Sequence, residues 1–176
     1  MIFKETRLKG AFIIEIDKFE DKRGFFAHAF SQATFESHGL SSRVVNTNIS
    51  FNTARGTLRG MHYQVAPYEE TKLIRCTRGA IYDVIIDLRR DSPTYRQWIG
   101  MELTADNYRL LYVPEQFAHG FQTLEDRTEV TYQVSQVYSP DAARGVRYDD
   151  PAFRVTWPLE VEVVSDRDAS WPTWSP

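Results

Sequence analysis

The sequence is poor in several features that mark whole classes of protein. Its one cysteine, Cys76, rules out an intramolecular disulfide and any multi-cysteine zinc site, and we expect it to be a small buried hydrophobe. No apolar stretch reaches the roughly 20 residues needed to span a bilayer. Charged residues also lie near the start of the chain, where a signal peptide would have its apolar region. These absences predict a soluble, cytoplasmic protein that does not associate with a membrane.

Positive charge is scarce as well. The chain has 21 Lys and Arg against 24 Asp and Glu, a net charge of −3, whereas general nucleic-acid binders are usually basic. We therefore expect no nucleic-acid partner, although local basic residues could still hold a phosphorylated small molecule. The chain also lacks a glycine-rich phosphate loop and the GxGxxG, HExxH and GxSxG motifs. Nucleotide hydrolysis, hydride transfer and serine hydrolysis thus lack their usual signatures.

Short strand-like segments with turns between them make up most of the chain. Patterning and β-branched or aromatic residues predict strands over 11–16, 43–51, 58–64, 72–77, 80–88, 98–103, 108–113, 120–123 and 128–134. Residues 31–38 predict a short helix that ends at Gly39, and residues 21–24 predict a turn. The length of 176 residues suits one domain with a sizeable core, and no shift in composition marks a boundary.

Residues 80–88 form the cleanest of these strands. Period-2 alternation puts Ile81, Asp83, Ile85 and Asp87 on one face of the strand. The other face is wholly apolar, so the carboxylates lie among isoleucines on one side only.

Many short strands with little helix favour a closed or two-sheet β architecture. Two glycine-punctuated units, 56–64 and 112–120, each contain a histidine, which suits a double-stranded β-helix of the cupin kind. The predicted fold class is therefore all-β, a cupin-type jelly roll with one or two short helices, in a single domain over residues 1–176. The tail from Trp157 is expected to pack along the outside of the barrel.

The two histidines in these units, His62 and His119, are candidate site residues. Each could be a core histidine with satisfied hydrogen bonds, but two in one small barrel favour a functional pocket. Histidine is well suited to proton transfer near pH 7, and Arg59 can hold a phosphate with two hydrogen bonds. Strict alternation along 58–64 puts Arg59 and His62 on opposite faces. They share a pocket only if the strand bends or bulges at Gly60.

A metal site is one alternative. Metal-binding cupins use a His-x-His pair, and Gln64 stands where the second histidine would follow His62. Glu69 or Glu70 could still combine with His62 and His119 in a three-ligand site of the kind that holds iron or zinc. A metal-dependent cupin, such as an oxygenase, is therefore a competing prediction.

Seven longer motifs follow one another along the chain. They are Asp21-Lys-Arg-Gly-Phe-Phe26, Gly56-Thr-Leu-Arg-Gly-Met-His-Tyr-Gln64, Lys72-Leu-Ile-Arg75, Gly79-Ala-Ile-Tyr-Asp-Val-Ile-Ile-Asp-Leu-Arg89, Ser92-Pro-Thr94, Phe117-Ala-His-Gly-Phe121 and Asp149-Asp-Pro151. In this order, over about residues 1–170, they resemble the dTDP-4-dehydrorhamnose 3,5-epimerases. The resemblance implies a dimeric jelly roll with no metal and no cofactor. It also implies an enzyme that inverts the stereocentres flanking the C4 ketone of a nucleotide-linked 4-keto-6-deoxyhexose.

Four catalytic roles follow from the resemblance. A base removes a proton α to the ketone, which gives an enolate, and a proton returns to the opposite face. His62 matches the family's base and Asp168 the aspartate that orients it, although from the residues alone Asp83 would be an equally good partner. Tyr132 matches the acid on the far face of the sugar, and Lys72 the cation beside the developing enolate oxygen.

Contacts to the substrate are also implied. The predicted substrate-binding set is Arg23, Phe26, His28, Asn46, Asn48, Arg59, His119 and Tyr138. Within it, Arg59 and Arg23 match arginines that bind the diphosphate, and Arg23 is expected to reach the site of a neighbouring subunit in a homodimer. Tyr138 matches a stacking surface for the nucleotide base.

Three positions depart from the family's usual pattern. His28 and Ala143 stand where glutamate is common, and Asn46 stands where glutamine is common. All three lie in regions linked to nucleotide binding rather than to proton transfer. The predicted reaction converts dTDP-4-dehydro-6-deoxyglucose to dTDP-4-dehydrorhamnose. The alternatives are an epimerase acting at one carbon, one acting on a GDP- or CDP-linked keto sugar, and a binding module without catalysis.

Overall fold

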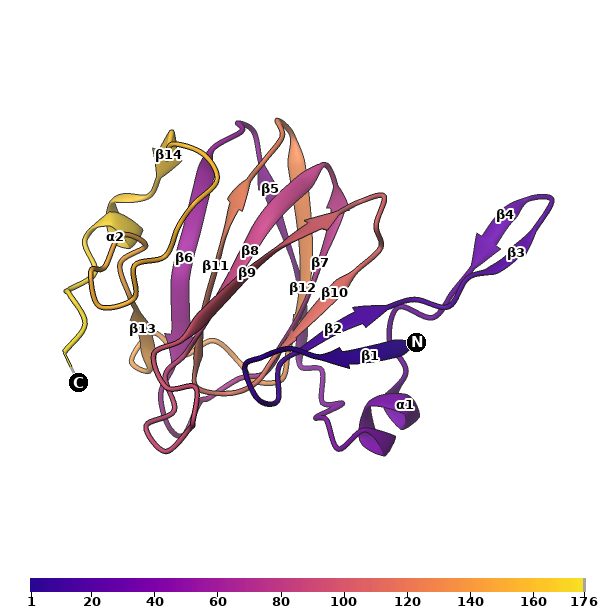
Figure 1. Cartoon of the computed structure of the whole chain (residues 1–176), viewed down its shortest axis with the longest axis horizontal. Helices are drawn as coiled ribbons and strands as arrows, with labels where there is room; N and C mark the ends of the chain where they lie inside the picture. Colours follow the sequence, from indigo (N-terminus) through magenta and orange to yellow (C-terminus); the bar gives the residue numbers. More distant parts are fainter. Residues whose placement is uncertain (176) are drawn as a thin grey trace.

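Two β-sheets packed face to face form the body of the molecule, and a hairpin projects from it (Figure 1). The structure is a computed structural model that describes residues 1–175. The first sheet has the strand order β1 (Ile2–Glu5), β2 (Phe12–Glu15), β10 (Leu110–Val113), β7 (Lys72–Arg78), β12 (Thr128–Val134) and β5 (Asn46–Asn52). The second has the order β13 (Ala143–Gly145), β6 (Thr57–Gln64), β11 (Phe117–Thr123), β8 (Ala80–Asp87) and β9 (Trp98–Thr104). The predicted all-β jelly roll is confirmed.

Each strand predicted from the sequence is present, with ends moved by no more than three residues. The predicted turn at 21–24 joins β3 (Phe19–Asp21) to β4 (Gly24–Phe26), the two strands of the projecting hairpin. The sequence reading missed five short strands, which are β1, β3, β4, β13 and β14 (Val163–Val164). All five have two to four residues, too few to show a clear period.

Two short helices complete the described chain. In α1 (Gln32–Ser37) the Ser31 hydroxyl caps the first turn by accepting a hydrogen bond from the Thr34 N–H at 3.4 Å, and Gly39 follows with a positive φ of 70°. The second helix, α2 (Asp166–Ala169), lies in the C-terminal tail. No helix within residues 1–175 is long and apolar enough to cross a membrane.

Strand β8 shows how the two faces of the second sheet are buried. Ile81 and Ile85 point into the core between the sheets, where they meet residues of the first sheet such as Ile74 and Leu111. The opposite, apolar face carries Val84 and Ile86 against the C-terminal segment, which includes Phe153, Trp157 and Trp174. The tail therefore covers the outer face of this sheet, as expected. Cys76 is fully buried in the core, and burial raises the pKa of its thiol to about 11.

Asp87 is fully buried at the end of β8 and is surrounded by donors. Its carboxylate accepts hydrogen bonds from the Arg89 guanidinium at 2.7 and 2.9 Å, from the Ser92 hydroxyl at 2.5 Å and from the Thr94 hydroxyl at 2.7 Å. Arg89 also donates to the carbonyl of Lys9 at 2.8 Å, so the cluster ties the N-terminal segment to the second sheet. Burial alone would raise the pKa of Asp87, but these donors outweigh it and lower the pKa.

Asp87→Asn is expected to destabilise the fold by about 3 kcal/mol at pH 7, because it leaves the Arg89 guanidinium without its anion. The exposed neighbour Asp91 supplies the control, and Asp91→Asn should change stability by less than about 0.5 kcal/mol. The Asp87 pKa is lower in the folded state, so its contribution is present above pH ~4 and is lost as the pH falls further. Urea unfolding at pH 7 and pH 3 should show that the difference in free energy of unfolding between wild type and Asp87→Asn is smaller at pH 3. An equal difference at both pH values would contradict a stabilising role for the ionised Asp87 carboxylate.

Candidate active site

A cleft between the two sheets has two lobes of about 330 and 300 Å³. Three side chains line both lobes: His62 from the second sheet, and Lys72 and Tyr132 from the first. A molecule lying in the cleft would therefore have a histidine on one side and a tyrosine and a lysine on the other.

A bulge in β6 gives this wall of the cleft its shape. His119 on β11 faces His62 and Phe121 faces Arg59, so three steps along β6 match two along β11. Gly60 lies within the bulge with φ at +134°, and a Cβ there would come within 2.5 Å of the Gly120 Cα, which leaves room only for glycine. Because of the bulge, Arg59 and His62 both line the second lobe. The condition stated from the sequence, that the two share a pocket only if the strand bulges at Gly60, is therefore met.

His62 and Asp168 form a hydrogen-bonded pair. The His62 Nε2 lies 2.6 Å from Asp168 Oδ1, and Asp168 Oδ2 accepts the Gly60 N–H at 3.1 Å. Ser165 caps α2 by accepting the Asp168 N–H at 3.1 Å, which holds the aspartate at the start of the helix. Asp168 is buried, whereas 44% of the His62 side chain is exposed, so the free edge of the ring faces the cleft. A carboxylate on Nε2 keeps the ring proton there and leaves Nδ1 as the basic nitrogen.

Asp168 stays ionised at neutral pH. Burial would raise its pKa, but the bond to His62, the Gly60 N–H and the Trp171 indole together outweigh burial and lower the pKa. The His62 imidazole therefore faces a negatively charged partner both before and after it accepts a proton.

Asp83 is the partner of the other cleft histidine. Its Oδ1 lies 2.6 Å from His119 Nε2, and the aspartate is fully buried in the second sheet. The suggestion that Asp83 could equally pair with His62 is therefore wrong, because β8 pairs with β11 and places Asp83 on the His119 side. The two paired histidines, His62 on β6 and His119 on β11, consequently lie opposite each other on neighbouring strands of one sheet and line one lobe.

Tyr132 and Lys72 lie on neighbouring strands of the first sheet. Burial raises the pKa of the Tyr132 phenol, with a further contribution from Glu70 that exceeds the opposing effect of Arg59, so the phenol is protonated at neutral pH. The buried Lys72 ammonium lies 3.2 Å from Glu70 Oε1 and donates to the His62 carbonyl at 3.3 Å. The first sheet thus presents an acid and a cation to the cleft.

The predicted binding residues divide between the cleft and the hairpin. Asn46, Asn48 and Tyr138 line the first lobe, and Arg59 and His119 line the second. Arg59 is held by the Asn52 side chain, whose Oδ1 accepts its Nε–H at 2.6 Å.

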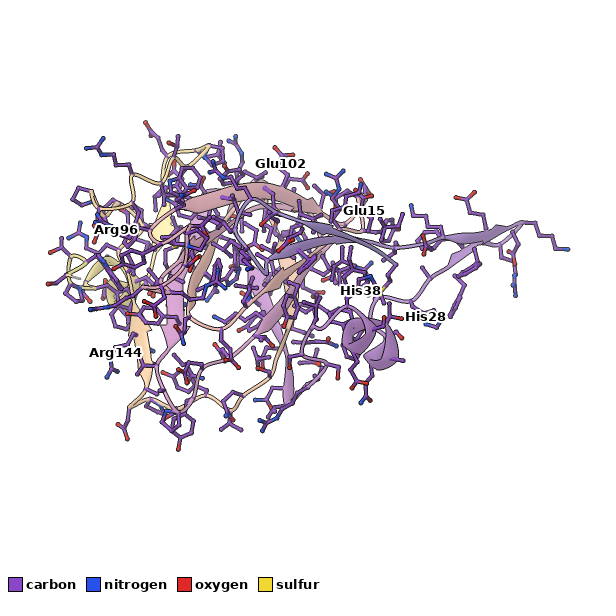
Figure 2. All side chains as sticks on the ribbon, turned by 60° about the horizontal axis from the view of Figure 1, so that its bottom comes forward. Glu15, His28, His38, Arg96, Glu102 and Arg144 are labelled. Atoms are coloured by element: carbon purple, nitrogen blue, oxygen red, sulfur yellow. The ribbon has the colours of Figure 1, made fainter. Side chains whose placement is uncertain are left out.

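Arg23, Phe26 and His28 lie away from the chain's own cleft. Arg23 is exposed and paired with Asp21 at 2.6 Å near the hairpin turn, and 63% of Phe26 is exposed on β4. Figure 2 shows His28 near the hairpin and Arg144, a residue of the cleft, at the opposite end of the molecule. One chain alone does not bring these three residues to the site.

Several residues that line the first lobe lie outside the predicted catalytic and substrate-binding sets. They are Tyr63, Gln64, Glu70, Val134, Ala143, Arg144 and Arg167. Arg167 directly precedes Asp168 on α2 and donates to the Tyr138 hydroxyl at 3.2 Å, so its position next to a predicted site residue was the available signal. Within residues 1–175 no three His, Cys, Asp or Glu side chains are grouped to hold a metal ion. The three-ligand site of His62, His119 and a glutamate is not formed, since Glu70 pairs with Lys72.

Comparison with known proteins agrees with this geometry. Residues 5–175 match the family model for dTDP-4-dehydrorhamnose 3,5-epimerase. The chain belongs to this family. The family member from Methanothermobacter thermautotrophicus is 41% identical over 172 residues, which cover 96% of this chain and 92% of the relative.

Solved structures extend the likeness to three dimensions. The epimerase from Bacillus anthracis str. Ames, crystallised with TDP and PPi bound, is 43% identical with a TM-score of 0.94, covering 98% of this chain and 99% of that one. The Legionella pneumophila Philadelphia 1 enzyme, in complex with dTDP-4-keto-L-rhamnose, has a TM-score of 0.90 at 34% identity, covering 98% and 92%. The epimerase-family chain therefore matches these three relatives over nearly their whole length.

Proposed function

We propose that this chain converts dTDP-4-dehydro-6-deoxyglucose to dTDP-4-dehydrorhamnose by inverting C3 and C5. The observation that carries the proposal is the placement of an oriented base and a protonated phenol on opposite walls of one cleft. The 2.6 Å bond to Asp168 orients His62 on the second sheet, and Tyr132 faces the same cleft from the first. Membership of the epimerase family supports the same reaction.

The reaction needs a proton moved from one face of the sugar to the other. His62 Nδ1 takes the proton on the carbon next to the C4 ketone, and the C–H electron pair moves to the ketone oxygen as an enolate. Lys72 and His119 lie where positive charge and hydrogen bonds stabilise that oxygen. Tyr132 then gives its proton to the opposite face of the carbon. Before the next cycle Tyr132 is reprotonated from solvent and His62 releases its proton to solvent. The same steps at the second carbon complete the change.

The remaining residues hold the nucleotide. Arg59 binds the diphosphate in the second lobe, and Asn46, Asn48 and Tyr138 hold the nucleoside in the first. A narrow cleft between two sheets also limits the water that could protonate the enolate without control. No cofactor takes part in these steps, and the cytoplasmic location stays a prediction from the sequence.

Deuterium exchange tests the reaction directly. The purified protein is incubated with dTDP-4-dehydro-6-deoxyglucose in D₂O, and C3 and C5 are followed by NMR. Deuterium at both carbons, with the product trapped by a 4-ketoreductase, is the expected result. Deuterium at one carbon would assign a mono-epimerase, and exchange only with GDP- or CDP-linked keto sugars would change the substrate. Tight dTDP binding without exchange would leave a binding module, and stoichiometric bound iron, zinc or manganese would favour a metal-dependent enzyme.

We also propose that two copies form a homodimer in which each hairpin reaches the partner's cleft. The hairpin exposes 63% of both Phe19 and Phe26, and it stands clear of its own barrel (Figure 1). Strand β5 is an edge of the first sheet and borders the second lobe, and its Ile49 is 69% exposed. Apolar surface on both elements supports contact between copies, with Arg23 delivered to the partner's diphosphate site.

Mixing two inactive variants tests this arrangement. Arg23→Ala and His62→Ala should each be nearly inactive alone. If Arg23 serves the partner's site, each mixed dimer has one complete site, so co-expression should restore about a quarter of wild-type activity. If Arg23 serves its own chain, no mixed dimer has a complete site, and the mixture should stay inactive. Sedimentation of each variant checks that dimers form.

A further inference from the structure

Trp171 lies directly behind the histidine–aspartate pair, and none of the roles given above uses it. Its indole ring lies 6.5 Å from the His62 imidazole, edge to face, and the Arg167 guanidinium lies 5.2 Å from the indole. The indole N–H is buried and has no hydrogen-bond partner of ordinary geometry. Trp171 thus lies close to His62 and to Arg167, the residue next to Asp168 in the chain.

Gly145 provides the seat for this indole. Gly145 on β13 is paired with His62 on β6, so the two residues face the same side of the sheet. A Cβ at Gly145 would overlap the five-membered ring of Trp171, which shows that the indole occupies the space of the missing side chain. The φ of Gly145 is not in the left-handed region, so steric room rather than backbone strain accounts for the glycine.

The helix that carries Asp168 has few attachments of its own. Helix α2 has only four residues, and its capping bonds are local: Ser165 Oγ accepts the Asp168 N–H, and the Arg167 carbonyl accepts the Ser170 N–H. Upstream, the two residues of β14 pair with the far end of β6, at Thr57 and Leu58. Figure 1 shows α2 and β14 beside β6, at the edge of the body. Besides the bonds of Asp168 to His62 and Gly60, the indole of Trp171 on Gly145 is therefore the packing contact that holds this segment on the sheet next to His62.

We propose that Trp171 is a positioning residue for proton transfer, whose indole, seated on Gly145, holds Asp168 against His62. This inference rests on the proposed function. Without the indole, α2 would move away from β6, water would enter behind the pair, and His62 would lose its fixed tautomer and orientation. Trp171 does not touch the cleft, so the substrate should bind as before.

A double-mutant cycle tests the seat and the indole together. Trp171→Ala should lower kcat by about tenfold or more, the range seen when groups supporting a site residue are removed, with KM nearly unchanged. Gly145→Ala should displace the indole and give a similar loss. In the Trp171→Ala background the added methyl has room, so Gly145→Ala should cost little more there. The proposal would be overturned if the two losses in kcat multiplied in the double variant, or if Trp171→Ala had wild-type kcat.

Two further variants separate positioning from general loosening of the tail. Trp174, three residues after Trp171, packs on Phe153. Trp174→Phe should leave kcat unchanged while lowering thermal stability somewhat. Trp171→Phe keeps an aromatic ring on Gly145 and should recover much of the activity; it also carries the test if Trp171→Ala does not fold. A Trp171→Phe variant with no more activity than a folded Trp171→Ala variant would argue against a role for the aromatic ring packed on Gly145.

A readout independent of turnover completes the test. Proton NMR should show a slowly exchanging, low-field imidazole proton for the His62–Asp168 bond, assigned by its loss in Asp168→Asn. This signal should weaken in Trp171→Ala and persist in Trp174→Phe, and its persistence in folded Trp171→Ala would overturn the proposal. If wild-type protein shows the signal but no epimerisation, the proposed function fails while the positioning role of Trp171 is still decided.

Discussion

His62→Asn is expected to lower kcat at least about a thousandfold, because no other group of the cleft is placed to take the proton next to the ketone. Asparagine keeps a hydrogen-bonding side chain of similar reach, so the wall of the cleft and the Asp168 environment change little. Binding of dTDP, measured by calorimetry, should therefore stay within about threefold of wild type. A drop in kcat with unchanged nucleotide affinity is the result typical of a lost chemical step.

The surface histidine His38 supplies the matched control. It follows α1 and stacks on Phe3 at 4.0 Å, on the far side of the first sheet from the cleft. His38→Asn should leave kcat unchanged. Deuterium exchange sharpens the comparison, since His62→Asn should block exchange at both C3 and C5. Exchange at the wild-type rate in that variant would remove His62 from the role of base.

The barrel could be predicted from the sequence because its strands are long enough to show their period. Residues 80–88 alternate over a full strand, and the predicted faces are the two buried faces of β8. The hairpin strands and β13 could not be found in this way, since each has three residues and is stabilised by pairing partners distant in sequence or by its turn.

The site was predictable only in part. His62 and His119 stand out as histidines within apolar strands, and the need for a bulge at Gly60 could be stated before the structure was known. The partner of His62 could not be deduced from local pattern, because Asp83 and Asp168 are both carboxylates and only the pairing of β8 with β11 sends Asp83 to His119. Asp168 reaches His62 across 106 positions of sequence, so it was indicated by family resemblance alone.

Tyr132→Phe is expected to separate proton removal from inversion. The variant keeps the ring and its packing but has no proton to return to the far face of the sugar. His62 can still form the enolate and can return a proton, by then exchanged with solvent, to the face from which it came. Deuterium should therefore still enter the substrate, while inversion at one or both carbons falls by about a hundredfold. Burial raises the pKa of Tyr132, so wild-type inversion should not be lost through ionisation of this phenol below about pH 10.

Tyr138→Phe is the control for the loss of a phenolic hydroxyl at the cleft. Tyr138 lies at the rim of the first lobe with 58% of its surface exposed, and its hydroxyl bonds to Arg167 rather than facing the His62 wall. Its replacement should raise KM modestly and leave the ratio of exchange to inversion unchanged. If Tyr132→Phe lowered exchange and inversion by the same factor, the phenol would serve enolate formation rather than proton return. The acid on the first sheet would then have to be sought elsewhere, because the opposite-wall mechanism requires a donor that acts after the base.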